Sequence, residues 1–281
     1  HSGTSMINEL RRKFSAGLQS VVPEPLGSFG LGILIGQRTT LPKDINDQLS
    51  TVGLTHIVAV SGYNLTIIVL AVHRLTRKRS KYQSTLLTLL LIGLFLVLAG
   101  SSASIVRAAI VSILSLWAWY YGRTFRPSVL VLLAASLTAW WFPPYIWSDI
   151  GWYLSFLAFT GVLLVAPLVT QRFMGKREPK ILAMVLIETL AAQVMTLPII
   201  LFIFGRLSII SVFANILIVP LVPLAMMLSF LAGLGGMLLP SLAGWVAWPT
   251  TLLMTYMLDI VRLLSALPHA SINYKINALQ L

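Results

Sequence analysis

Apolar runs long enough to cross a bilayer, separated by short polar loops, fill most of this chain of 281 residues. A membrane-spanning α-helix needs about 20 apolar residues, whereas barrel strands appear as alternating segments of about 10. The runs here are continuous, so the pattern favours helices. The predicted spans cover residues 54–73, 84–101, 103–121, 127–143, 149–170, 181–204, 209–230 and 243–266. We therefore predict an all-α, polytopic membrane protein with about seven or eight spans.

The region 206–241 leaves the span count open. Pro220 and Pro223 lie inside its apolar run, and Gly233 and Gly236 follow. Proline removes a backbone donor and glycine weakens a helix, so a broken or re-entrant element is an alternative to a continuous span. Losing one span here would place the C-terminal end on the other side of the membrane.

Three shorter apolar patterns precede the spans. Met6–Val22 places apolar side chains at helical spacing opposite a basic face, which predicts an amphipathic helix on the membrane surface. Leu26–Gly36 is apolar and glycine-rich but too short to span, which favours a re-entrant or half-inserted element. Pro42–Leu54 is mixed and predicts a short interfacial helix. His1–Ser5 resembles the scar of a cleaved tag and does not enter the fold prediction. We expect residues 23–281 to form one membrane domain of a larger protein.

Composition and charge agree with a membrane location. Hydrophobic residues make up 57% of the chain and charged residues 10%, with a mean hydropathy of +0.89. A soluble domain has about 25% charged residues. The net charge is +12, and much of the basic excess lies in loops Arg74–Lys81, Arg123–Arg126 and Arg172–Lys180. The positive-inside rule places these three loops in the cytoplasm.

Several kinds of chemistry are excluded or disfavoured. The chain has no cysteine, which excludes disulfides, thiolate metal sites and cysteine catalysis. No paired-histidine metal motif is present, so we expect neither a metal nor another cofactor. No phosphate-binding G-x-x-x-x-G-K-[ST] loop is present, so the chain itself does not hydrolyse a nucleotide.

Polar residues interrupt the first predicted span. The segment Gly53–Ile67 carries His56, Ser61 and Asn64 in apolar surroundings, and Gly62 follows Ser61. Polar groups within a membrane are costly and face a cavity, a partner or a substrate path. We interpret the Ser-Gly pair as a helix break that turns backbone and side chains towards a lumen.

Arg107 is the sharpest single residue, because arginine stays charged in proteins. Ser101, Ser104 and Arg107 are spaced at i, i+3 and i+6 and form one helix stripe. Two interpretations remain open. Arg107 either reaches the interface or pairs with a buried acid, or it lines a path used by an anion.

Acids and amides within or beside the later spans are further candidates. Asp149 stands where it could cap a helix start, and Glu188 could pair with Arg107 or Arg206 and hold helices together. A second polar patch combines Gln193 with Thr196, and one helix face carries Ser208, Ser211 and Asn215. Asp259 and Arg262 predict a local ion pair.

Four segments in this order resemble the ComEC family, the inner-membrane channel proteins of bacterial DNA uptake. They are Gly53-Leu-Thr-His-Ile-Val-Ala-Val-Ser-Gly62, Ser104-Ile-Val-Arg-Ala108, Asp149-Ile-Gly-Trp-Tyr-Leu-Ser-Phe-Leu157 and the run Arg206–Pro223. The family often has Leu-His after Ser-Gly and Phe-Gln after Asp-x-Gly. Here Tyr63-Asn64 and Trp152-Tyr153 stand at those places. A histidine role at position 64 therefore does not carry over.

The resemblance implies a multi-pass transmembrane competence domain that carries single-stranded DNA across the bacterial inner membrane during transformation. It implies as partners an external DNA receptor, a cytoplasmic ATPase or helicase, and OB-like and metallo-β-lactamase-like domains of a full-length protein. The nuclease domain does not occur in this sequence, so we expect no enzymatic activity from it. The expected polar DNA path comprises His56, Ser61, Asn64, Ser104, Arg107, Asp149, Ser155, Glu188, Gln193, Arg206 and Asn215.

Two other functions remain as alternatives. A small-solute or ion-coupled transporter could use Glu188 and Asp149 as its ion site, although the inverted repeats typical of such carriers are not visible. A membrane hydrolase could use Ser61 and His56, but Ser61 lacks the G-x-S-x-G frame of such enzymes.

Overall fold

A computed structural model describes most of the chain, and all structural statements below concern the residues that it describes. They are residues 2–37, 39–58, 65, 76, 80–99, 103–123, 126–141, 143–144, 148–175, 181–208, 210–239, 243–268 and 271–273. The predicted Ser61 and Asn64 lie outside these ranges. The side chains of Ser104 and Arg206 are likewise not described.

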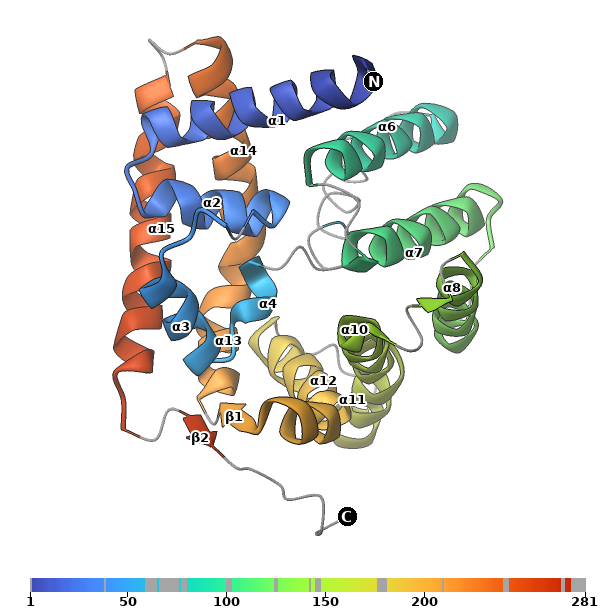
Figure 1. The fold of residues 1–281 in the computed structure, drawn as a ribbon. Coiled ribbons are helices and arrows are strands. Elements are labelled where there is room, and N and C mark those ends of the chain that lie inside the picture. Colours follow the sequence, from blue (N-terminus) through green and yellow to red (C-terminus); the bar gives the residue numbers. More distant parts are fainter. Residues whose placement is uncertain are drawn as a thin grey trace.

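The described chain is almost entirely helical, which confirms the predicted all-α class (Figure 1). The N-terminal helices are α1 (Ser2–Val21), α2 (Leu26–Ile35), α3 (Lys43–Thr51) and α4 (Thr55–Val58). The middle helices are α6 (Lys81–Ala99), α7 (Ala103–Tyr120), α8 (Pro127–Trp141), α10 (Ile150–Thr160), the π-turn η1 (Gly161–Val165) and α11 (Ala166–Met174). The last helices are α12 (Ile181–Phe204), α13 (Ser211–Ile218), the 3-10 turn η2 (Val219–Leu221), α14 (Val222–Leu238) and α15 (Ala243–Ser265).

A two-stranded antiparallel ladder joins the end of α12 to the segment after α15. Strand β1 (Arg206–Ser208) pairs with β2 (Ser271–Asn273), with Arg206 opposite Asn273. This short ladder is a departure from the expectation of helices alone. It fixes the connection between α12 and α13, where the fourth motif begins.

Every predicted span after the first falls on helical residues, and the spans 149–170 and 209–230 each cover several consecutive helical elements. The span 54–73 lies mostly outside the described residues. Three helical runs are long and apolar enough to cross a membrane, namely Ile150–Met174, Ala183–Ile203 and Ser211–Leu238. Shorter apolar helices cover Leu26–Ile35, Lys81–Val97, Ile105–Tyr120 and Pro127–Trp141. The structure therefore supports several spanning helices and does not confirm the count of seven or eight.

The region 206–241 contains the break that its prolines predict. Helix α13 ends at Ile218, one 3-10 turn holds Pro220, and α14 starts beside Pro223. The tighter turn absorbs the missing backbone donors. The whole run from Ser211 to Leu238 still has the length of a span.

The N- and C-terminal helices form one body around a shared apolar core. In Figure 1, α1 and α2 cross α14, which runs beside α15. The backbones of α1 and α14 meet closely, because a Cβ on Gly17 would lie 2.8 Å from the Gly233 carbonyl oxygen. Phe14 and Leu18 of α1 are buried in this contact, so the apolar face of the predicted amphipathic helix is partly covered by protein. Helix α2, predicted as half-inserted, is buried from Gly27 to Ile35.

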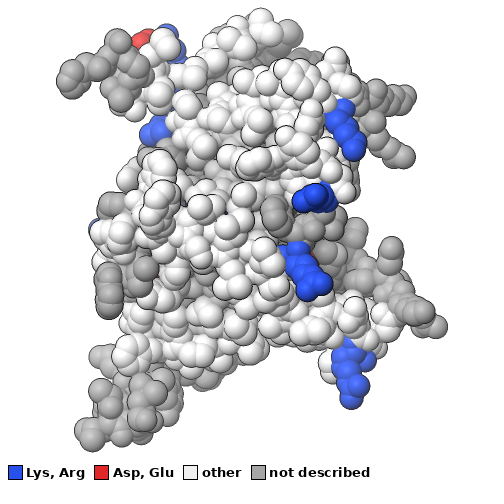
Figure 2. Space-filling view, turned by 90° about the vertical axis from the view of Figure 1, so that its right-hand side faces the viewer, with Lys and Arg blue, Asp and Glu red and all other residues white. Residues whose placement is uncertain are grey.

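Helices α6 and α7 form an antiparallel pair with a second small core. The ammonium of Lys81, at the start of α6, lies 5.9 Å from the Trp119 ring centroid, near the end of α7. Lys81 and Arg123, the described residues of the two predicted cytoplasmic loops next to these helices, therefore lie at the same end of the pair. Figure 2 shows Lys and Arg side chains spaced along one edge of a largely uncharged face. Exposed basic residues at the helix ends include Lys81, Arg123, Arg126 and Arg172.

Candidate functional site

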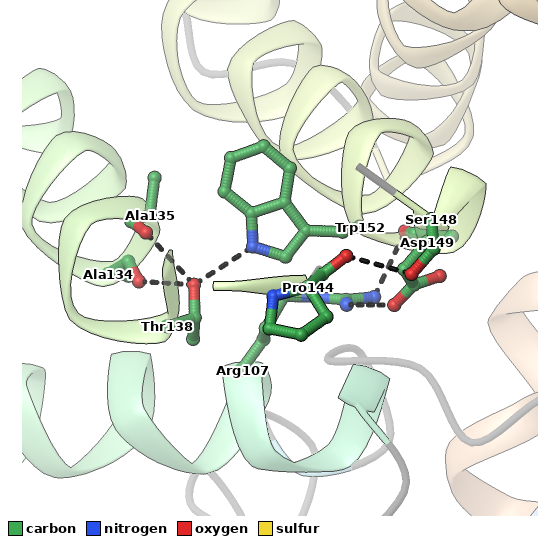
Figure 3. A network of polar contacts seen from close by, with 9 residues as sticks. Arg107, Ala134, Ala135, Thr138, Pro144, Ser148, Asp149 and Trp152 are labelled. Atoms are coloured by element: carbon green, nitrogen blue, oxygen red, sulfur yellow. Dashed lines mark hydrogen bonds and ion pairs between the residues drawn. The ribbon is translucent and has the colours of Figure 1, made fainter. Parts of the chain in front are cut away.

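Arg107 is buried and joins the second motif to the third. Its side chain is 3% exposed and reaches from α7 to the start of α10 (Figure 3). The Nη2 atom donates a hydrogen bond to the Gly151 carbonyl oxygen at 3.0 Å, and Nη1 lies 3.5 Å from Oδ2 of Asp149. The Phe156 ring centroid lies 6.0 Å from Cζ. A backbone oxygen, a carboxylate and an aromatic face thus contact the guanidinium.

Asp149 is at the N-cap position of α10, as predicted, but its carboxylate does not cap the helix. The residue has φ −105° and ψ 93°, and its side chain makes no capping hydrogen bond. The carboxylate faces Arg107 instead. The predicted alternative of an Arg107–Glu188 pair is wrong, because Arg107 pairs with Asp149. Glu188 lies half-buried on α12.

Trp152 extends the network to α8. Its Nε1 donates to Oγ1 of Thr138 at 3.0 Å, and Thr138 is 2% exposed (Figure 3). The Trp152 ring lies 4.8 Å from the Phe156 ring and 5.2 Å from the Tyr153 ring, between centroids. The aromatic residues that depart from the ComEC pattern therefore lie beside the Arg107 site.

A second polar cluster joins the first motif to the fourth. Nδ1 of His56 lies 3.2 Å from the Gly53 carbonyl oxygen, and the ring lies beside the Asn215 side chain. Nδ2 of Asn215 donates to the Ser211 carbonyl oxygen at 2.8 Å. The Ser211 hydroxyl donates to Oε1 of Gln193 at 3.2 Å. Side chains from α4, α12 and α13 meet here.

Comparison with known proteins identifies the family. The family model described as Competence protein matches residues 33–281. The chain belongs to this family. ComE operon protein 3 of Bacillus subtilis (strain 168) is 27% identical over 215 residues, which cover 75% of this chain and 26% of that relative. The chain thus spans about a quarter of the length of that relative. No solved structure matches.

Membership in the Competence family confirms the resemblance to ComEC proteins. Together with several helices able to cross a membrane, it makes the chain a multi-pass protein of the bacterial inner membrane. The four Competence-like motifs meet in pairs. The first contacts the fourth through His56 and Asn215, and the second contacts the third through Arg107 and Asp149.

The structure brings the described candidates of this Competence chain onto neighbouring helices. Ser155 is half-buried and lies one helical turn after Gly151, whose carbonyl binds Arg107. Helix α10 packs against α12, which carries Glu188 and Gln193. The predicted local pair of Asp259 and Arg262 is confirmed at 3.4 Å.

Sequence reasoning missed two contributors to these clusters. Thr138 accepts the Trp152 hydrogen bond from an apolar helix in which nothing in the sequence marks it. Gly53 was noted only as the start of a segment. Its φ of +74° and the 2.6 Å that would separate its Cβ from Cβ of Ser211 make it a contact point between α3 and α13. The glycine after Val52 at the end of a polar helix was the available signal.

Proposed function

We propose that this chain is the membrane part of a channel that passes single-stranded DNA into the cytoplasm during natural transformation. Membership in the Competence family supports a role in DNA uptake. The observation that carries the finer proposal is Arg107, a charge held inside a membrane domain next to a row of aromatic rings. Single-stranded nucleic acids bind where positive charge follows the backbone and aromatic faces accept bases.

The hydrogen-bonding partners of Arg107 within the protein indicate its role in the proposed channel. Asp149 and the Gly151 carbonyl already accept from the guanidinium, which fixes its position between α7 and α10. In a water-poor surrounding, a fixed charge acts over a longer range than in water. Arg107 therefore holds the wall of the path in place, with Asp149 as its counter-ion, and the guanidinium is the positive end of this ion pair.

The polar cluster that joins the first and fourth motifs supplies a further part of the proposed path. His56, Gln193 and Asn215 offer neutral hydrogen-bonding groups that tolerate any base sequence. The proposed path also includes the other residues predicted for it, namely Ser61, Asn64, Ser104, Ser155, Glu188 and Arg206. A partner ATPase or helicase supplies the driving force, and an external receptor delivers the strand.

Cysteine accessibility tests the path directly, because these 281 residues contain no cysteine. In full-length protein with any other cysteines replaced, Ser155→Cys is expected to react with a membrane-impermeant thiol reagent. DNA stalled in transit by a bulky end group should slow this reaction about tenfold, since a strand in the path excludes the reagent. Leu90→Cys, at a position 61% exposed on the outer face of α6, is the lipid-facing control and should react slowly in both states.

Equal labelling of Ser155→Cys with and without stalled DNA would contradict the proposed path. Protection by a small solute, with no protection by DNA, would instead favour the transporter alternative. The Leu90→Cys control separates reagent entry through the path from entry through the lipid.

A further inference from the structure

We infer that Thr138 is a positioning residue, whose hydroxyl fixes the Trp152 ring and thereby the aromatic side of the Arg107 site. Thr138 is not among the residues of the predicted polar path. The contact itself is independent of what the chain transports. Its consequence for uptake rests on the proposed function, and the experiment below separates the two.

The hydrogen-bonding pattern around Thr138 allows one arrangement. A hydroxyl has one hydrogen to donate and two lone pairs to accept with. Oγ1 of Thr138 lies 2.9 Å from the Ala134 carbonyl oxygen and 3.0 Å from that of Ala135, so its hydrogen points into the backbone of α8 (Figure 3). The indole of Trp152 is a donor only. The free lone pair of Thr138 is therefore the acceptor of the Trp152 hydrogen bond.

Two contacts at different ends determine the orientation of Trp152. Its nitrogen is held by Thr138, and its ring leans on Phe156 with an interplanar angle of 57°. Phe156 is 8% exposed and lies beside the guanidinium of Arg107. Contacts thus run without a gap from Thr138 through Trp152 and Phe156 to Arg107, across α8, α10 and α7.

Packing alone does not require a hydroxyl at this position. Valine has nearly the same volume as threonine and the same branching at Cβ, so it fills the same buried space. What valine lacks is the acceptor for the indole. In Thr138→Val the N–H of the half-buried Trp152 has no partner there, and the ring turns to find one. The specific role of Thr138 is therefore orientation.

Fluorotryptophan labelling with ¹⁹F NMR measures this orientation in the full-length protein. Trp152→Phe assigns the Trp152 resonance among those of the chain's 8 tryptophans. Thr138→Val is expected to shift that resonance and leave the others in place, whereas Thr138→Ser, which keeps the acceptor, is expected to leave it unshifted. Uptake of labelled DNA should fall about fivefold in Thr138→Val, the effect of losing one hydrogen bond, and recover in Thr138→Ser.

Two results would overturn the inference, namely an unshifted Trp152 resonance in Thr138→Val and a Thr138→Ser variant that behaves like Thr138→Val. Unchanged uptake despite a shifted resonance would overturn the consequence for uptake and leave the contact itself established. If Thr138→Val does not fold, Trp152→Phe tests the same bond from the donor side and should lower uptake similarly. If Thr138→Val does fold, adding it to Trp152→Phe should cause no further loss of uptake. A shifted resonance together with normal uptake in Arg107→Gln would refute the proposed function and leave the contact itself established.

Discussion

Replacing Arg107 with glutamate is expected to abolish DNA uptake by the full-length protein. The substituted carboxylate would face Asp149 at a position that is 3% exposed. Breaking a buried ion pair costs about 3–5 kcal/mol, and here two like charges would also repel each other. Since 1.4 kcal/mol corresponds to a factor of ten, we expect uptake to fall by about 100-fold or more. Labelled DNA taken up per cell, divided by the amount of protein in the membrane, measures the effect.

Graded variants of the same pair separate charge from geometry. Arg107→Lys keeps the charge but loses the planar fork that reaches both Asp149 and Gly151, so an intermediate loss is expected. Asp149→Asn leaves the shorter bond to Gly151 in place and should lose less than Arg107→Glu. Normal uptake in a well-expressed Arg107→Glu variant would refute the proposed role. A variant that no longer reaches the membrane reports on folding and is excluded by the normalisation.

How far the sequence predicted this site differs from residue to residue. An arginine inside an apolar run has to be compensated, so a buried partner for Arg107 was predictable. Which acid pairs with Arg107 was not predictable, because Asp149 lies 42 residues away along the chain and Glu188 lies further still. The choice depends on α10 starting beside α7, which is a matter of helix packing and leaves no mark in hydrophobic periodicity. For the same reason the two interpretations of Arg107 stayed open.

The fold, like the site, was predictable from the sequence only in part. Apolar run length determines helices in a membrane, so the predicted spans from residue 84 onwards fall on α6 to α15, although α14 continues to Leu238 beyond the predicted end at residue 230. The amphipathic pattern of α1 was equally visible, but a basic face opposite an apolar one does not distinguish a lipid surface from a protein partner. In the structure Phe14 and Leu18 are buried against α14. Gly17 and Gly236 permit this contact, and their pairing is a property of two distant segments.

The meeting of the first and fourth motifs also depends on a long-range contact that the sequence does not reveal. Gly53 ends α3 in a left-handed conformation, with the Leu54 amide bonded to the Leu49 carbonyl at 2.8 Å. This is the pattern of a glycine-terminated helix. The turn brings Gly53 close to Ser211. It thereby directs α4, which carries His56, towards Asn215.

Gly53→Ala is therefore expected to destabilise the protein and to separate His56 from Asn215. A left-handed conformation costs a residue with a Cβ about 1–2 kcal/mol, and overpacking a rigid contact adds about 1–3 kcal/mol. The added methyl group would lie 2.6 Å from Cβ of Ser211, which belongs to a buried helix start and cannot swing away. The thermal unfolding midpoint in detergent and DNA uptake should both fall.

Substitutions at two other glycines and at Ser211 distinguish backbone strain at Gly53 from the clash with Ser211. Gly122, with φ +67° and open space around it, carries the strain without the clash, so Gly122→Ala should cost only about 1–2 kcal/mol. Gly93 lies within α6 and meets nothing within 4 Å, so Gly93→Ala should be neutral or raise stability by up to about 1 kcal/mol. Ser211→Gly removes the clashing atom and should be less harmful in the Gly53→Ala background than alone. If Gly53→Ala is no worse than Gly122→Ala, the contact with Ser211 does not position the His56 segment, and the link between the first and fourth motifs rests on the proximity of His56 to Asn215.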